Sequence, residues 1–203
     1  AAIDNVRFYH QATAPQTRAV ETAPGVLCRQ IWRPIETCGL YVPAGSAPLV
    51  STLIMLAAPA AVAGVPNRVL VSPPNKAGET HPAIIVAAAA CGVEAIWQIG
   101  GAQAIAALTF GAGLAKADKI FGPGNAYVTE AKRFAAALAG GPSVDLPAGP
   151  SELAVVADAS ANAAFVAADL LSQAEHDADA QVVLISPSAE LLSEVEREVE
   201  LQI

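Results

Sequence analysis

The sequence reads Ala95-Ile96-Trp97-Gln98-Ile99-Gly100-Gly101-Ala102-Gln103-Ala104-Ile105-Ala106-Ala107-Leu108 at its centre. The short apolar run predicts a strand over Ala95–Ile99, and the alanine-rich segment predicts a helix over Gly101–Phe110. The glycine pair between them permits close backbone approach, and the helix N-terminus offers N–H donors to an anion. Because the full G-x-G-x-x-G spacing is absent, a dinucleotide contact and a plain strand-to-helix turn both remain open.

The same alternation extends from Asn67 onward, which is typical of βαβ units that build a parallel sheet. The expected strands are Arg68–Ser72, Ala95–Ile99, Lys119–Phe121, Leu153–Ala157 and Gln181–Ser186. The expected helices between them are Glu79–Ala90, Gly101–Phe110, Asn125–Ala139 and Asn162–His176. We therefore predict an α/β fold with parallel sheets flanked by helices.

The flanking regions add a few elements. We expect a strand over Val26–Pro34, a Gly/Pro-rich loop over Gly39–Pro48 and helices over Leu49–Ala63, Ala1–Ala12 and Ser188–Ile203. The turn-rich segment Asp145–Ser151 predicts a crossing between domains. The apolar stripe of the last helix is still running at Ile203, so we expect the chain to be part of a longer protein.

Composition narrows the classes of function. Hydrophobic residues make up 54% of the 203 positions and charged residues 15%, which predicts a packed core and excludes a disordered chain. A net charge of -8 and few aromatic side chains disfavour nucleic-acid binding. Pro48–Val65 is too interrupted to span a membrane, and the N-terminus does not resemble a signal peptide. An odd number of cysteines without a C-x-x-C pair favours a reducing cytoplasm.

A second glycine-rich turn follows the next expected strand, in Phe121-Gly122-Pro123-Gly124-Asn125. Asn125 stands where its amide either caps the following helix or reaches a ligand. Two such turns at neighbouring strands indicate a binding region, because ligands of open parallel sheets gather at the carboxyl ends of the strands. Tyr41, in the first Gly/Pro loop, either lies against a flat ligand or covers the core.

Gln173 and His176 are three residues apart on an expected helix, so both side chains can reach one target. A zinc ion suits that pair, with Asp169 on the same face as a support, but zinc takes about four ligands, so the helix supplies at most half of a site. A solvated polar helix end is the alternative interpretation.

Together these segments resemble the histidinol dehydrogenase family. The motifs that carry the resemblance are G-L-Y-V-P-A-G-S-A-P-L, G-G-A-Q-A-I-A-A-L, D-K-I-F-G-P-G-N-A-Y-V-T-E-A-K-R, D-L-P-A-G-P-S-E and D-L-L-S-Q-A-E-H, in that family's order. The resemblance implies a cytoplasmic homodimer that oxidises L-histidinol to L-histidine through an aldehyde, with NAD and zinc as cofactors.

The resemblance also assigns residues. Tyr41, Gln103 and Asn125 would bind NAD, Ser151, Gln173 and His176 would contact substrate, and Gln173 and His176 would be zinc ligands. It further implies that an inserted Rossmann-like NAD-binding domain, residues 41–151, lies between residues 1–40 and 152–203 of a second, discontinuous α/β domain.

Some positions depart from the family pattern. Ala44 replaces a glycine, Asp177 follows the zinc helix where glycine is usual, and Asn75–His81 reads as a surface insertion. The family's general-base Glu-His pair is expected after Ile203, so we assign no catalytic residue within this chain and expect it to be inactive in isolation. The alternative is a non-catalytic module that binds a dinucleotide or a metal.

Overall fold

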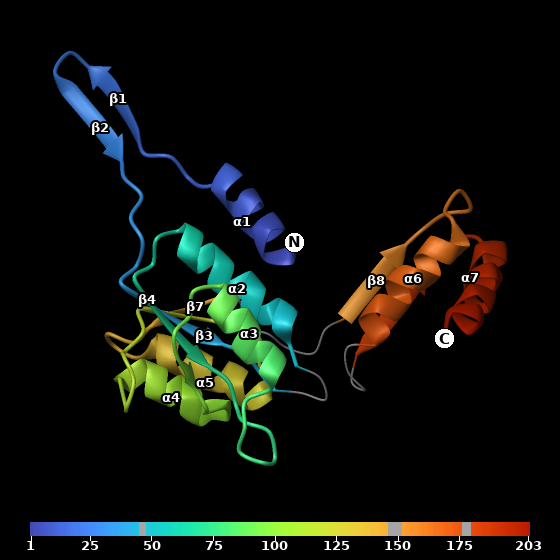
Figure 1. Cartoon of the computed structure of the whole chain (residues 1–203). Coiled ribbons are helices and arrows are strands. Elements are labelled where there is room, and N and C mark those ends of the chain that lie inside the picture. Colours follow the sequence, from blue (N-terminus) through green and yellow to red (C-terminus); the bar gives the residue numbers. More distant parts are fainter. Residues whose placement is uncertain (45–47, 146–151, 176–179) are drawn as a thin grey trace. The chain divides into compact units, whose positions relative to one another are not determined.

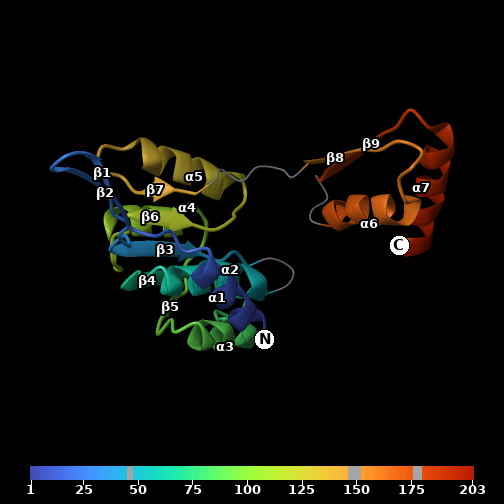
Figure 2. The ribbon, with the colours of Figure 1, turned by 90° about the horizontal axis from the view of Figure 1, so that it is seen from above.

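The computed structural model describes residues 1–44, 48–145, 152–175 and 180–203. They form two units, Ala1–Ala148 and Gly149–Ile203. The first unit is built around a parallel sheet of five strands in the order β5-β4-β3-β6-β7 (Figure 2). These strands are β3 (Thr37–Tyr41), β4 (Asn67–Val71), β5 (Ile96–Trp97), β6 (Lys119–Phe121) and β7 (Ser143–Val144).

Helices cover both faces of this sheet (Figure 1). On one face α2 (Val50–Val62) and α3 (Pro82–Ala90) pack over Leu40 and Leu70. On the other face α4 (Gly101–Phe110) and α5 (Ala126–Ala137) pack over Tyr41 and Val71. Adjacent strand residues point to opposite faces, so a strand covered on both faces is buried throughout, as β3 is.

The predicted α/β class and parallel sheet are confirmed, whereas the predicted loop starting at Gly39 is wrong for Gly39–Tyr41. These residues end β3, which pairs with β4 and β6 at the centre of the sheet. Gly39 lies so close to α4 that a Cβ atom there would stand 2.8 Å from Leu108 Cδ1. Glycine usually weakens a strand, but at position 39 the close packing of β3 against α4 leaves no room for a larger residue. The strand expected over Ala95–Ile99 is shorter, and β7 was not predicted.

The N-terminal elements are α1 (Ala2–Ala12), β1 (Arg18–Ala23) and β2 (Val26–Gln30). The two strands pair antiparallel in a sheet of their own, and every residue in them is exposed. The strand expected over Val26–Pro34 therefore ends at Gln30. Gly25, with φ +81°, makes the turn between the two strands.

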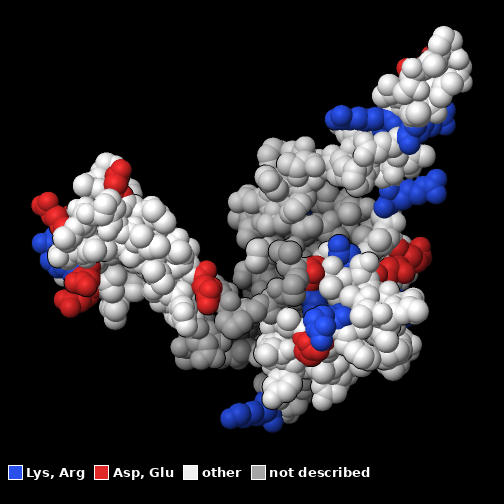
Figure 3. All heavy atoms as spheres, turned by 180° about the vertical axis from the view of Figure 1, so that it is seen from behind, with Lys and Arg blue, Asp and Glu red and all other residues white. Residues whose placement is uncertain are grey.

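The second unit consists of β8 (Glu152–Val156), α6 (Ala163–Ala174), β9 (Gln181–Ile185) and α7 (Ala189–Gln202). The two strands are parallel, and the inward residues Val155 and Leu184 pack with α6 and α7 around Leu170 and Leu191. On the face shown in Figure 3 the charged side chains of this unit are mostly acidic. The unit therefore reproduces the expected βαβ pattern, with a polar outer face on α7.

The insertion of residues 41–151 between residues 1–40 and 152–203 stays a prediction, although β3 runs across the boundary proposed between residues 40 and 41. The alanine-rich helix expected over Leu49–Ala63 is confirmed as α2, with Leu53 and Ala57 buried. None of the helices in the described ranges is long and apolar enough to cross a membrane.

Candidate functional site

The strand order places a topological switch point between β3 and β6. After β3 the chain adds β4 and β5 on one side and then returns to add β6 and β7 on the other. Open α/β sheets bind ligands at the carboxyl ends of the strands where the order reverses. In this unit those ends are Tyr41 of β3 and the turn of residues 122–125, which follows β6.

Tyr41 is 4% exposed and packs in the core between the sheet and helices α4 and α5. Its hydroxyl oxygen accepts a hydrogen bond from the backbone N–H of Gly101 at 3.1 Å, at the first residue of α4. Of the two roles that the sequence left open for Tyr41, the position in the core is therefore observed. The same side chain joins the switch point to the glycine pair that follows β5.

The glycine pair has the geometry of a close turn. A Cβ atom at Gly100 would overlap Pro73, and Gly101 adopts φ +66°. A Cβ atom at Gly101 would also stand 2.7 Å from Gln103 Oε1, so the amide of Gln103 folds back over the start of α4. Gln103 is exposed and remains accessible to a ligand.

The second turn lies directly against β3. Gly122 adopts φ +121°, and a Cβ atom there would overlap the carbonyl group of Tyr41. Asn125 is the N-cap of α5, and its side-chain oxygen accepts a hydrogen bond from the Val128 N–H at 3.1 Å. Capping, one of the two roles that the sequence left open, is thus observed. The capping bond uses only the side-chain oxygen, and because Asn125 is exposed, its side-chain amide NH2 group is still available to a ligand.

A partly buried ion pair beside this turn was not predicted from the sequence. Lys132 is 3% exposed, and its Nζ contacts Asp145 Oδ1 and donates to the Gly122 carbonyl at 2.8 Å. Asp145 Oδ2 accepts a hydrogen bond from the Gly122 N–H at 2.6 Å. A lysine in the buried stripe of α5, between Val128 and Ala135, is the signal that could have indicated it.

The residues that the sequence predicts to bind zinc and substrate are only partly described. Gln173 lies in the last turn of α6, and its Nε2 is buried without a hydrogen-bond partner among the described residues. Because amide nitrogen and oxygen are exchanged by a flip, that buried atom is equally a carbonyl oxygen available to a cation or a polar ligand. The other predicted members, His176 and Ser151, lie outside the described residues, as does Asp177.

Among the described residues, the side-chain amide of Gln173 is therefore the one group that supports the predicted zinc site. Within the described ranges no group of three or more His, Cys, Asp or Glu side chains could hold a metal ion. Of the two predicted zinc ligands only Gln173 lies among the described residues, and its role as a ligand stays a prediction.

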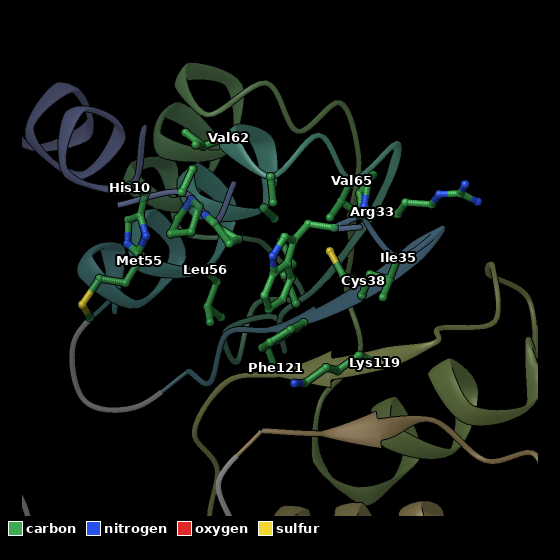
Figure 4. Close-up of a pocket in the computed structure, with 18 residues that line it drawn as sticks. His10, Arg33, Ile35, Cys38, Met55, Leu56, Val62, Val65, Lys119 and Phe121 are labelled. Carbon is green, nitrogen blue, oxygen red and sulfur yellow. The ribbon is translucent and has the colours of Figure 1, made fainter. Parts of the chain in front are cut away.

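A cavity of about 680 Å³ in the first unit is lined by residues of α1, α2, β3 and β6 (Figure 4). The lining of the cavity is mainly apolar. Of its two cationic side chains, Arg33 points away from the cavity and Lys119 places its Nζ 5.0 Å from the centre of the Phe121 ring. Burial raises the pKa of the Cys38 thiol in its wall to about 11, against the opposing charge of Arg68. The Cys38 thiol is thus protonated at neutral pH, and a thiol is a much weaker nucleophile than a thiolate.

Comparisons with known proteins show which family the chain resembles. The family model described as histidinol dehydrogenase matches residues 1–203. Histidinol dehydrogenases of Xanthomonas oryzae and Legionella pneumophila are 54% and 51% identical, over 100% and 99% of this chain and 47% of each relative.

A crystal structure of histidinol dehydrogenase from Elizabethkingia anophelis is also similar, with 48% identity and a TM-score of 0.92 over 99% of this chain and 46% of that one. The chain spans about half the length of the relatives it matches. By its sequence and its fold, this chain belongs to the histidinol dehydrogenase family.

Proposed function

We propose that the protein carrying this chain oxidises L-histidinol to L-histidine with NAD+ and zinc. The observation that supports the proposal is the meeting of Tyr41, the Gly100–Gly101 turn and the Gly122–Asn125 turn at the switch point of the sheet. Family membership supplies the substrate class, since the similar proteins are named histidinol dehydrogenases.

The nucleotide side of the reaction belongs to the first unit. Tyr41 holds the start of α4 in place, Gln103 lies beside that N-terminus and Asn125 begins α5. Helix N-termini and close glycine turns favour the pyrophosphate of a dinucleotide. Bound NAD+ would accept a hydride in each of two successive oxidations, from alcohol to aldehyde and from hydrated aldehyde to carboxylate.

The substrate side involves Ser151, Gln173 and His176, with Gln173 and His176 as zinc ligands. The buried unpaired amide of Gln173 supports this assignment, because a buried polar group without a partner is costly unless a ligand satisfies it. Zinc, when bound, would act as a Lewis acid that holds the alcohol and amine of histidinol. The proton-accepting Glu-His pair would follow Ile203, which leaves binding and orientation to the described residues.

The setting of the whole protein is a further part of the proposal. The proposed homodimer follows from the resemblance to the family. The proposed location in the cytoplasm agrees with three cysteines that form no disulfide among the described residues. The substrate is a small molecule, and neither a nucleic acid nor a membrane enters the proposal.

Activity of the complete protein is the direct test. NADH absorbance should rise when the zinc-loaded protein receives histidinol and NAD+, and the rise should need both. A protein that makes no NADH under these conditions contradicts the proposed reaction.

Zinc content tests the role of Gln173 separately. Gln173→Ala should lower the zinc bound by the dialysed complete protein, because it removes one ligand, whereas Gln181→Ala on the exposed start of β9 should not. Equal zinc in the two variants, measured by atomic absorption, would remove Gln173 from the metal site.

A second candidate is a module that binds a dinucleotide or a metal without catalysis. The observation in its favour is that the three predicted NAD residues all lie in the described first unit. Calorimetry with NAD+ on the complete protein, combined with an NADH assay of the same sample with zinc and histidinol, separates the candidates: the module would bind NAD+ and make no NADH. Steady NADH production by this chain would contradict both the module and the expected need for a downstream Glu-His pair.

A further inference from the structure

Both backbone polar groups of Gly122 are bound by side chains from other parts of the fold. The Gly122 N–H donates to Asp145 Oδ2 at 2.6 Å, and its carbonyl accepts from Lys132 Nζ at 2.8 Å. Lys132 also pairs with Asp145 Oδ1, which closes a ring of three contacts. The first residue of the turn is therefore held by an ion pair instead of by a strand partner.

The three members of the ring come from three elements. Gly122 follows β6, Lys132 lies in α5 and Asp145 follows β7. The N–H of Asp145 donates to the Ile120 carbonyl at 3.1 Å, which ties Asp145 to β6 as well. A movement of the Lys132 or the Asp145 side chain would thus displace the turn relative to the end of β6.

Little room is left for the turn to adjust. At φ +121° Gly122 has a conformation that only glycine adopts easily, and its Cα faces the Tyr41 carbonyl. Two residues later, a Cβ atom at Gly124 would overlap the side chain of Val128. A side chain therefore fits at neither of these glycines, and the ion pair is bonded to the residue at which the turn begins.

We propose that Lys132 and Asp145 are positioning residues that hold the Gly122–Asn125 turn against the end of β3 for the nucleotide. The inference rests on the proposed NAD+ site at this switch point. Neither side chain needs to touch the nucleotide, because the pair acts through the backbone of Gly122. A merely structural ion pair would instead alter stability and leave the affinity of the folded chain for NAD+ unchanged.

The test measures NAD+ affinity by calorimetry on the folded fraction of the 203-residue chain. Asp145→Asn removes one of the two carboxylate acceptors, and Lys132→Met keeps the apolar stem without the charge. We expect each to weaken NAD+ binding by about 10-fold, or about 1.4 kcal/mol. Glu130→Gln, in the exposed Glu130–Arg133 pair of the same helix, is the matched control and should change affinity by less than about 2-fold.

A double variant distinguishes positioning from stability. Lys132→Met combined with Asp145→Leu leaves no buried charge alone, so its midpoint of unfolding should lie above that of the Lys132→Met single variant. Its NAD+ affinity should stay about 10-fold low, because Gly122 is still unheld. Affinity restored together with stability, or a folded single variant with unchanged affinity, would overturn the inference while leaving the NAD+ site intact.

One measurement needs no variant. Nuclear magnetic resonance of the unsubstituted chain should show the Gly122 amide and the Lys132 ammonium nitrogen both shifting as NAD+ is added. Shifts at Asn125 without any at Gly122 and Lys132 would overturn the positioning role. A chain that binds no NAD+ at all would overturn the nucleotide site and, with it, this inference.

Discussion

The hydroxyl oxygen of Tyr41 accepts a hydrogen bond from the backbone N–H of Gly101 across 60 residues of sequence. The bond joins the end of the central strand β3 to the first turn of α4. One N–H at the helix start is thus satisfied by the protein itself, and the direction of the helix is tied to the end of the sheet.

Tyr41→Phe should remove this bond and keep the packing of the ring. We expect the first unit to lose about 1 kcal/mol of stability, because a partly buried N–H is left without its acceptor. Denaturant unfolding followed by tryptophan fluorescence suits the measurement, since Trp32 and Trp97 both lie in this unit. Tyr9→Phe, on the exposed α1, is the control, and an equal loss in both variants would contradict the role given to the bond.

Asn125→Asp should separate the two roles of Asn125. An aspartate caps a helix as well as asparagine does, so stability should hold. NAD+ affinity should fall by about 5-fold, because like charges about 4 Å apart in water repel by about 1 kcal/mol. Asn162→Asp makes the same change at the cap of α6 and should leave NAD+ binding as it was. Calorimetry that finds no difference between the two variants would limit Asn125 to capping.

Gly122→Ala should destabilise the first unit far more than Gly25→Ala does. Both glycines have positive φ, but a Cβ atom at Gly25 meets nothing within 4 Å whereas one at Gly122 overlaps the Tyr41 carbonyl. We expect about 1 kcal/mol for the hairpin variant and about 3 kcal/mol or more for the turn variant. Thermal unfolding of the two proteins gives the comparison, and equal midpoints would show that the turn relaxes away from β3.

Alkaline pH should destabilise the chain through Cys38. Burial raises the pKa of this thiol from 9.0 to about 11, so the unfolded chain loses the proton at a lower pH than the folded one. The contribution to stability is complete below pH 9 and is lost as the pH rises towards 11. Midpoints of thermal unfolding measured across this range should fall less steeply for Cys38→Ala. Parallel curves for the two proteins would assign the alkaline loss to other groups.

Most of the helices, and strands β4, β6, β8 and β9, could be predicted because their patterns are local. The expected Gly101–Phe110 helix and Lys119–Phe121 strand match α4 and β6. The central strand β3 escaped because Gly39 and the nearby prolines indicate a loop, while the pairing and packing that make it a strand come from β4, β6 and Leu108.

The candidate site divides in the same way. Tyr41, Gln103 and Asn125 were found from turns and motifs, whereas the contact of Lys132 and Asp145 joins α5 to a residue thirteen positions later and has no local signature. Buried charge is visible in a sequence only as a lysine in an apolar stripe, and its partner depends on the fold.

The position of β3 also bears on how the chain is made. It is the first strand of its sheet to leave the ribosome, and both strands that will flank it are synthesised later. The contact of Thr37 with Asp118 closes a loop of 81 residues, so one edge of β3 stays open until β6 has emerged. We expect this closure to be a slow step, because contacts between distant residues form late, and a nascent chain that stops before Lys119 would expose the edge from which the nucleotide site is later built.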